Sequence, residues 1–141
     1  MAARVAIDER LFTWPAEHPA LLGSRCGCGV TTFPSQSNCP RCGDEMEHVE
    51  LPTRGTLWTW TTQGFRPKGP PEGYYLGPET DEDFVPYFIG YVELPGHCKV
   101  ESRLVGDAFE IGDQMELVIV PFRTDADGNE RMTFAFERVV T

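Results

Sequence analysis

The stretch from residue 26 to residue 43 reads CGCGVTTFPSQSNCPRCG and contains two close pairs of cysteines. Cys26 and Cys28 form the first pair, and Cys39 and Cys42 form the second. Zn²⁺ prefers four soft ligands in a tetrahedron, and two tight turns can each present two thiolates to one ion. The spacing therefore predicts a four-cysteine zinc ribbon. Because four protein ligands leave no open position for water or substrate, we expect this zinc to be structural.

The residues around the cysteine pairs support a metal site and raise one question about it. Gly29 and Gly43 follow the pairs, where the chain must turn sharply and glycine can adopt a positive φ at little cost. The first pair is one residue shorter than the usual C-x-x-C, and His48 lies close enough to replace a missing thiolate. Cys98 has no partner in the sequence, and we expect it to be a small apolar residue of a strand.

Two other uses of the cysteines stay open at this point. Disulfides would suit a secreted domain, but the first residues, MAARVAIDE, lack the apolar segment of a signal peptide. Four thiolates also bind iron, as in rubredoxin, and iron would imply electron transfer. The sequence alone does not distinguish zinc from iron.

Length and charge limit the class of protein. A chain of 141 residues can bury roughly two thirds of its surface in one compact core. No stretch approaches the ~20 apolar residues of a membrane span, so we expect a cytoplasmic protein without membrane contact. The formal net charge of −10, from 22 acidic and 12 basic residues, disfavours nucleic acid as a partner. Nucleic-acid affinity comes largely from neutralised phosphates.

The second half of the chain has a period of two and predicts five strands. The strands are expected at residues 57–62, 87–94, 99–104, 115–120 and 131–137. Pro95-Gly96 and Asp127-Gly128 mark turns between them. Five short strands with no long helix among them fit a small barrel such as the OB-fold. The predicted fold class is therefore mainly β.

The segment before the cysteines is predicted to be helical. Phe12 and Trp14 precede Pro15, and further apolar residues follow it, which suggests two short helices broken by proline. These apolar side chains cover either the protein's own core or a partner, so Phe12 and Trp14 are candidate contacts. The predicted domains are a helical docking segment at 1–24, the zinc ribbon at 25–50 and the OB-fold domain at 51–141.

A long connection at residues 64–86 interrupts the predicted barrel. Connections longer than ~15 residues in a compact domain are usually functional or disordered. Aromatic residues give this one apolar surface, and two cations within it could meet a phosphate, although an ordinary solvated loop explains them equally well. The candidate contact residues are Phe65, Arg66, Lys68, Tyr74 and Tyr75.

A nucleic-acid-binding module is the alternative of another class. Zinc ribbons and OB-folds often bind single strands, and aromatic residues on strands can stack on bases. Trp58 and Trp60 alternate in the sequence, so they are expected to share one face of their strand. The chain has no dense cluster of Lys and Arg, which argues against this alternative.

Several motifs occur in an order typical of one known family. They are Leu22–Gly29, Phe33-Pro34, Cys39–Gly43, Gly55–Leu57, Pro86–Leu94 and Ile111–Asp113. In these motifs the chain resembles the acyl-CoA-associated family called domain of unknown function thirty-five, over nearly its whole length. The resemblance implies a rubredoxin-like zinc ribbon joined to an OB-fold. The shortened first cysteine pair and the insertion at 64–86 depart from the family pattern.

The resemblance also implies a function. Members of this family are typically non-catalytic partners of thiolase-fold proteins, which make or break carbon–carbon bonds in acyl-CoA substrates. The expected partner is a thiolase-fold catalytic subunit, as a heterotetramer with two copies of each chain. The expected substrate of the complex is a CoA ester, with thiolytic cleavage of a 3-oxoacyl-CoA as the reaction. Acyl transfer, or retro-aldol cleavage of a steroid side-chain CoA ester, is the alternative.

The residue inventory agrees with a role outside the chemistry. None of His18, His48 and His97 stands in a recognisable Cys/His or Ser/His/Asp signature. No glycine-rich phosphate loop is present in the sequence. We therefore assign no catalytic residue and expect this chain not to be an enzyme by itself.

Overall fold

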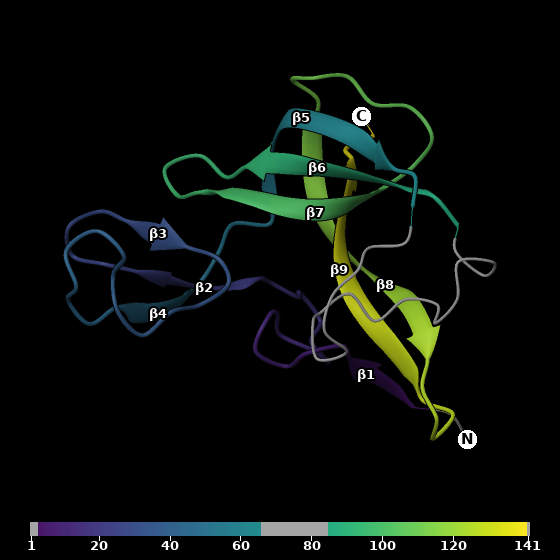
Figure 1. Ribbon diagram of the computed structural model, residues 1–141, viewed down its shortest axis with the longest axis horizontal. Helices are drawn as coiled ribbons and strands as arrows, with labels where there is room; N and C mark the ends of the chain where they lie inside the picture. The colour runs from purple at the N-terminus through teal and green to yellow at the C-terminus, as the bar shows by residue number, and fades with distance from the viewer. Residues whose placement is uncertain (1–2, 66–84, 141) are drawn as a thin grey trace.

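The structure, a computed structural model, describes residues 3–65 and 85–140, and its regular secondary structure in these ranges is entirely strand (Figure 1). The strands are β1 (Arg4–Ala6), β2 (Leu22–Arg25), β3 (Thr31–Thr32), β4 (Glu47–Glu50), β5 (Arg54–Gln63), β6 (Tyr87–Glu93), β7 (Lys99–Val105), β8 (Gln114–Thr124) and β9 (Glu130–Arg138). Within the described residues, no helix is present that could cross a membrane.

Five of the strands close into a barrel. The order is β5-β6-β7-β9-β8, and β8 pairs back onto β5. β7 and β9 are parallel, and the other barrel pairs are antiparallel. This arrangement is the five-stranded Greek-key barrel of an OB-fold, and closure leaves few unpaired edges. The predicted strands and the mainly β fold class are confirmed. Of the other four strands, β1 joins the barrel sheet beside β9, and the remaining three form a separate sheet in the order β3-β2-β4.

The prediction of N-terminal helices is wrong. β1 extends the barrel sheet by pairing in parallel with β9. Residues 11–13 and 20–22 then lie side by side as extended chain, with Thr13 N–H donating to the Ala20 carbonyl and Leu22 N–H to the Leu11 carbonyl. Two prolines between these segments, Pro15 and Pro19, lack the N–H that a helix requires. The apolar pattern therefore arises from an extended pair and not from helical periodicity.

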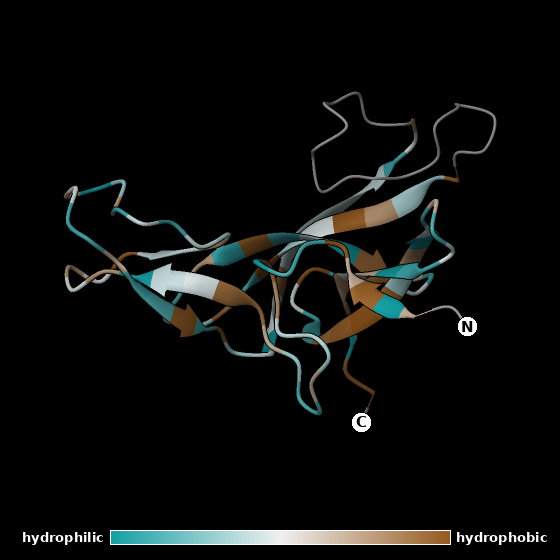
Figure 2. Ribbon diagram, turned by 90° about the horizontal axis from the view of Figure 1, so that it is seen from below, coloured by the Kyte–Doolittle hydropathy of each residue, from teal (hydrophilic) through white to brown (hydrophobic). Residues whose placement is uncertain are grey.

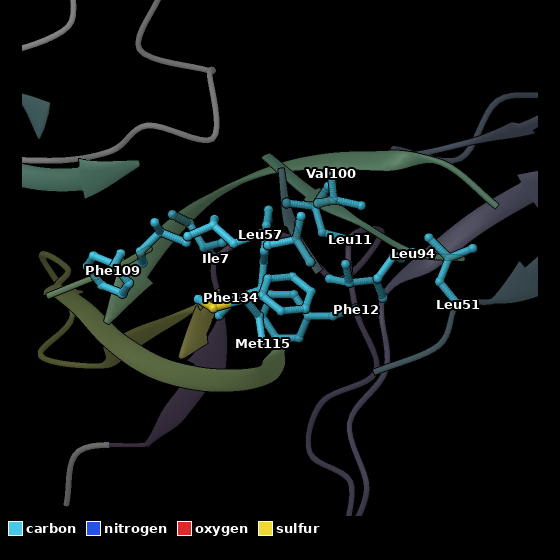
Figure 3. Close-up of a cluster of buried hydrophobic side chains, with 14 residues drawn as sticks. Ile7, Leu11, Phe12, Leu51, Leu57, Leu94, Val100, Phe109, Met115 and Phe134 are labelled. Carbon is cyan, nitrogen blue, oxygen red and sulfur yellow. The ribbon is translucent and has the colours of Figure 1, made fainter. Parts of the chain in front are cut away.

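The core joins the N-terminal segment to the barrel (Figure 3). Phe12 is 1% exposed, and its ring packs edge-on against Phe134 of β9 at a centroid distance of 6.4 Å. Phe33, from the segment after β3, contacts the same ring at 5.4 Å. Leu21 and Leu51 are buried in the same cluster. The apolar residues before β2 therefore cover the protein's own core.

A β-bulge separates the two tryptophans of β5. The pairing of β5 with β6 shifts register between Leu57 and Thr59. As a result Trp58 contacts Tyr91, whereas the Trp60 ring packs against Phe88 at 5.8 Å. Tyr91 is exposed, whereas its neighbour Val92 is fully buried. Phe88 is four residues from Val92 along β6 and therefore shares its face. The Trp58–Tyr91 and Trp60–Phe88 contacts thus lie on different faces. The expectation that Trp58 and Trp60 share a face is wrong, because a bulge adds one residue and reverses the alternation.

Gly90 lets β5 and β6 approach closely inside the barrel. A Cβ at this position would lie 2.6 Å from the Thr59 carbonyl oxygen and 3.0 Å from the Leu104 side chain. Backbone atoms cannot move aside as a flexible side chain can, so the closed barrel requires glycine here.

We expect Gly90→Ala to lower the free energy of unfolding by about 1–3 kcal/mol, the usual cost of overpacking a core. Gly64→Ala is the matched control, because no atom lies within 4 Å of the added Cβ there. Thermal unfolding of both variants provides the measurement. Equal midpoints for the two alanine variants would show that the barrel can accommodate the extra methyl group.

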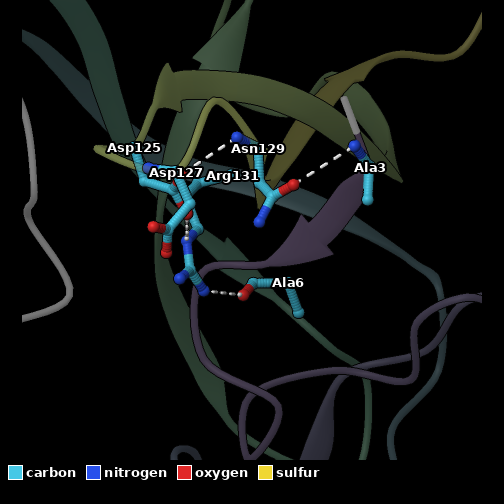
Figure 4. Close-up of polar contacts among 6 residues, drawn as sticks. All are labelled: Ala3, Ala6, Asp125, Asp127, Asn129 and Arg131. Atoms are coloured by element: carbon cyan, nitrogen blue, oxygen red, sulfur yellow. Dashed lines mark hydrogen bonds and ion pairs between the residues drawn. The ribbon is translucent and has the colours of Figure 1, made fainter. Parts of the chain in front are cut away.

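The β8–β9 connection is a hairpin organised by one carboxylate (Figure 4). Asp125 Oδ1 accepts hydrogen bonds from the N–H groups of Asp127 and Asn129, and Oδ2 pairs with Arg131 Nε at 2.9 Å. Gly128 has a φ of +83°, which confirms the predicted turn. The N–H of Asn129, followed by Arg131 and then by the N–H of Asp127, holds the pKa of Asp125 below its ordinary value, against the opposing effect of desolvation. Arg131 also donates to the Ala6 carbonyl and so connects the hairpin to β1.

Because the pKa of Asp125 is lower in the folded chain, its stabilisation is present above pH ~4 and is lost as the pH falls through the folded pKa. We expect Asp125→Asn to lower the melting temperature at pH 7, where Oδ2 no longer pairs with Arg131. The difference from the unmodified protein should shrink below pH ~4. Melting curves recorded between neutral and acid pH measure this difference in melting temperature, with Asp127→Asn as the control. A difference that does not change with pH would rule out the carboxylate as its source.

Candidate metal centre

The two cysteine pairs occupy tight turns at the end of the small β3-β2-β4 sheet. In the first turn Gly29 N–H donates to the Cys26 carbonyl, and in the second Gly43 N–H donates to the Cys39 carbonyl, both at 2.9 Å. Gly29 and Gly43 have φ of +100° and +80°. The prediction that these glycines adopt positive φ is therefore confirmed.

The structure brings the four cysteine sulfurs together. The Sγ atoms of Cys26, Cys28, Cys39 and Cys42 all lie within 4.8 Å of one another. Two separations are shorter, 3.4 Å between Cys26 and Cys42 and 3.7 Å between Cys28 and Cys39. A tetrahedral ion with ~2.3 Å bonds to sulfur requires sulfurs ~3.8 Å apart, so this cluster fits such an ion. The short first pair does not prevent either thiol from reaching the centre.

Burial and backbone hydrogen bonds differ among the four thiols. Cys26 and Cys39 are each 4% exposed, whereas Cys28 and Cys42 are exposed to solvent. The N–H of Cys42, followed by that of Arg41, stabilises the Cys39 thiolate and lowers its pKa to about 7. The Arg41 nitrogen lies 3.4 Å from this sulfur. The thiolate is the form that binds metal, so the N–H groups of the second turn favour the metal-binding form of Cys39.

His48 lies outside the cluster and belongs to a polar chain beside it. Its Nδ1 is 2.6 Å from Ser35 Oγ, which is 2.9 Å from Ser24 Oγ. Ser24 is fully buried, donates to the Gln36 carbonyl and accepts from the Gln36 N–H. This chain connects β2, β4 and the segment that leads to the second cysteine pair. It was not predicted, because its members are far apart in sequence and form no local motif.

Cys98 is a partly buried residue packed against the barrel core. Burial raises the pKa of its thiol, so the neutral form is favoured. These properties agree with the predicted small apolar role.

The metal-binding turns extend from the barrel on a sheet that is anchored at its base (Figure 1). Leu51 N–H donates to the Leu21 carbonyl, and the Arg25 guanidinium is 3.5 Å from the Gly96 carbonyl in the β6–β7 turn. The loops at the far end of this sheet are mainly hydrophilic, whereas hydrophobic residues concentrate along the barrel strands (Figure 2). The four cysteines therefore lie in a polar extension that has only a small apolar cluster of its own.

The structure places the predicted contact residues in different environments. Phe12 is in the core, so its ring is not available to a partner on this surface. Trp14 is partly buried, and its indole N–H donates to the Arg4 carbonyl at 3.3 Å. Phe65 is 71% exposed at the end of the described segment. The other four, Arg66, Lys68, Tyr74 and Tyr75, lie outside the described residues.

A cleft of about 550 Å³ beside β1 was not predicted from the sequence. Its lining consists of residues 4–10 together with Trp14, Pro15 and Arg131. The guanidinium groups in it are already paired with carboxylates, Arg4 with Glu130 at 3.1 Å and Arg10 with Asp8 at 2.8 Å. The cleft therefore offers little surplus positive charge to a phosphate.

Comparison with known proteins places this chain in a family. A sequence profile described as the C-terminal OB-fold domain of ChsH2 matches residues 48–120, which are β4 to most of β8. The chain belongs to the DUF35 family. This assignment confirms the resemblance recognised in the sequence motifs.

The relatives of this DUF35 chain include thiolase subunits. It is 30% identical over 125 residues to the benzoylsuccinyl-CoA thiolase subunit BbsA of Thauera aromatica, covering 86% of this chain and 78% of that protein. It is also 30% identical to a DUF35 domain-containing scaffold protein of Methanothermobacter thermautotrophicus, covering 86% and 89%. Among solved structures, the Ltp2-ChsH2(DUF35) aldolase has a similar fold, with a TM-score of 0.58, 24% identity and 86% coverage of both chains.

We expect Cys39→Ser to lose the bound metal, because a hydroxyl cannot replace a thiolate as a soft ligand. The polar extension should then become sensitive to proteolysis while the barrel persists. Elemental analysis of the purified variants and limited digestion followed by mass spectrometry measure both effects. Cys98→Ala, which removes a thiol outside the cluster, is the control and should retain the metal. Equal metal content in the two variants would contradict a site at the four cysteines.

Proposed function

We propose that this chain is a non-catalytic subunit of a thiolase-like complex that acts on acyl-CoA. The supporting observation is its similarity, along 86% of its length, to a protein named as a benzoylsuccinyl-CoA thiolase subunit. The described structure offers a closed barrel and a four-thiol cluster, both suited to a structural role. The reacting groups then belong to a thiolase-fold partner, and this chain contributes binding surface. A heterotetramer with two copies of each subunit is the proposed assembly.

The metal is proposed to be zinc. Four thiolates fill a tetrahedral coordination shell, so the ion would hold the two turns together and offer no site for substrate. Structural zinc contributes on the order of 10–16 kcal/mol to the folding of small metal-binding units. Such a contribution suits an extension whose own apolar cluster consists of Cys26, Cys39 and Met46 with Val30 against it. Iron at the same site would give a coloured, redox-active protein, and an absorption spectrum distinguishes the two.

A subunit without reacting groups can still accelerate the reaction of its partner. Covering the substrate excludes water, and fixing its position reduces the entropy lost at the transition state. The proposed contacts to the CoA ester are Phe65, Arg66 and Lys68 with Tyr74 and Tyr75, all in the connection between β5 and β6. Two cations there match the phosphates of CoA, which supports this assignment.

The test uses the purified chain and a thiolase-fold protein sought among the genes that neighbour its own. We expect the two to co-elute in size-exclusion chromatography and to cleave a 3-oxoacyl-CoA only when mixed. Full activity of the larger protein alone would refute the proposal. An unrelated thiolase in place of the neighbouring protein is the control and should neither bind nor gain activity.

The same assay distinguishes the thiolase from the aldolase alternative. Thiolysis of a 3-oxoacyl-CoA breaks the bond between C2 and C3: the acyl group is transferred to the thiol of free CoA, and the remainder leaves as a second CoA ester. Retro-aldol cleavage needs a 3-hydroxyacyl-CoA and no free CoA, and it releases an aldehyde or ketone together with a shortened CoA ester. We expect cleavage of the 3-oxoacyl-CoA that requires free CoA, and no cleavage of the matching 3-hydroxyacyl-CoA. Cleavage of the 3-hydroxyacyl-CoA without free CoA would assign the complex to the aldolase class.

A further inference from the structure

The short strand β1 forms an edge of the barrel sheet. It pairs with β9, and no other strand of the described chain pairs with its outer side (Figure 1). Every second residue of an edge strand bonds to the neighbouring strand, and just after β1 the Ile7 N–H donates to the Met132 carbonyl of β9. Val5 therefore bonds to β9, whereas the backbone N–H and carbonyl groups of Arg4 and Ala6 point to the open edge.

An open edge of this kind can pair with a strand of another molecule, because its backbone groups have no strand partner. The cleft of about 550 Å³ beside β1 gives access to it. β1 contains no proline and no bulge, which are two common protections of sheet edges. Its one charged residue, Arg4, is already paired with Glu130 at 3.1 Å. Any protection of this edge therefore comes from residues outside the strand.

Two side chains from outside β1 cap the carbonyls at its open edge. The Trp14 indole N–H donates to the Arg4 carbonyl at 3.3 Å. The Arg131 guanidinium donates to the Ala6 carbonyl at 3.4 Å (Figure 4). Both side chains line the cleft, so they occupy the side from which another strand would approach. Both outward carbonyls of β1 thus have a partner within the chain.

Packing and an ion pair hold these two caps in place. Trp14 packs against the hydrophobic core. Arg131 Nε pairs with Asp125 at 2.9 Å, and the Asp125 side chain is only 9% exposed. Neighbouring strands of a sheet lie about 4.7–4.9 Å apart. An added strand would therefore have to displace the indole and the guanidinium, and it would break the contacts that hold them.

We propose that Trp14 and Arg131 keep the edge of β1 from pairing with a second copy of this chain. Two identical edges can pair antiparallel about a twofold axis, because each offers the same N–H and carbonyl groups to the other. The two caps bond to the carbonyls and fill the space that a second β1 would need. Because the edge and its caps belong to this chain alone, the protection does not depend on the proposed function.

The test measures self-association of the full chain by analytical ultracentrifugation over a range of concentrations. The variant Trp14→Leu/Arg131→Met removes both donors and keeps apolar side chains in their place. Its dissociation constant for self-association should fall by about tenfold or more, the equivalent of about one net hydrogen bond. Trp58→Leu/Arg54→Met is the matched control. It removes an exposed tryptophan and a paired arginine elsewhere on the barrel, and it should leave self-association unchanged.

A proline in β1 separates edge pairing from general aggregation. Ala6→Pro removes the outward N–H of residue 6 and leaves the bond from the Ile7 N–H to β9 intact. Proline is tolerated at edge positions whose N–H faces solvent. Added to Trp14→Leu/Arg131→Met, this substitution should restore the monomer, whereas aggregation caused only by lost packing would persist.

Three results would overturn the protective role of the two caps. The first is a folded Trp14→Leu/Arg131→Met variant that is as monomeric as the control. The second is association that Ala6→Pro does not reverse. The third is a dimer of the unmodified chain that Ala6→Pro dissociates, because the edge would then already be in use. If circular dichroism shows that the double variant is unfolded, Arg131→Met alone decides by the same criteria, since it uncovers the Ala6 carbonyl and leaves Trp14 in place.

Discussion

The packing of two distant segments on the ring of Phe134 is the constraint on which the rest of the structure depends. Phe134 belongs to the last barrel strand, Phe12 comes from the N-terminal segment, and Phe33 comes from the segment that follows β3 of the small sheet. The barrel supplies most of this core, and the N-terminal segment and the segment after β3 each add a ring to it, so one common core holds the barrel and the base of the small sheet together. The cysteine cluster lies beyond this core and orders the portion that hydrophobic packing does not reach.

The sequence predicted the barrel better than it predicted the N-terminal segment, for identifiable reasons. The strands after residue 54 alternate between apolar and polar residues, a pattern that depends only on local geometry. The apolar residues around Phe12 and Leu21 lack such a period, and their extended pairing is decided by β9 and the core. The bulge after Leu57 is also a tertiary feature, since its register follows from closure of the barrel. The cysteine cluster could be predicted because its ligands lie close in sequence. The polar chain of Ser24, Ser35 and His48 could not, because its members meet only in the folded sheet.

The division of the molecule suits a subunit that provides shape and not chemistry. The barrel is closed and well packed, and its outer face presents aromatic side chains that internal contacts already hold in place. The metal-binding turns are kept at a distance from that face by a sheet anchored at Leu51 and Arg25. This separation of the cysteine turns from the barrel supports the proposed role of the chain as a subunit that positions a larger partner.

The polar chain beside the metal centre also fixes the location of a proton. Besides the bond from the Gln36 N–H to Ser24, three hydrogen bonds join Gln36, Ser24, Ser35 and His48, and each bond requires one hydrogen. Ser24 donates its hydrogen to the Gln36 carbonyl, so Ser35 donates to Ser24, and the third hydrogen must come from His48 Nδ1. The neutral ring is therefore the Nδ1–H tautomer, and its Nε2 lies outside the chain of hydrogen bonds. The buried serine of β2 thus sets both the tautomer and the orientation of a ring on β4, across the ribbon next to the cysteines.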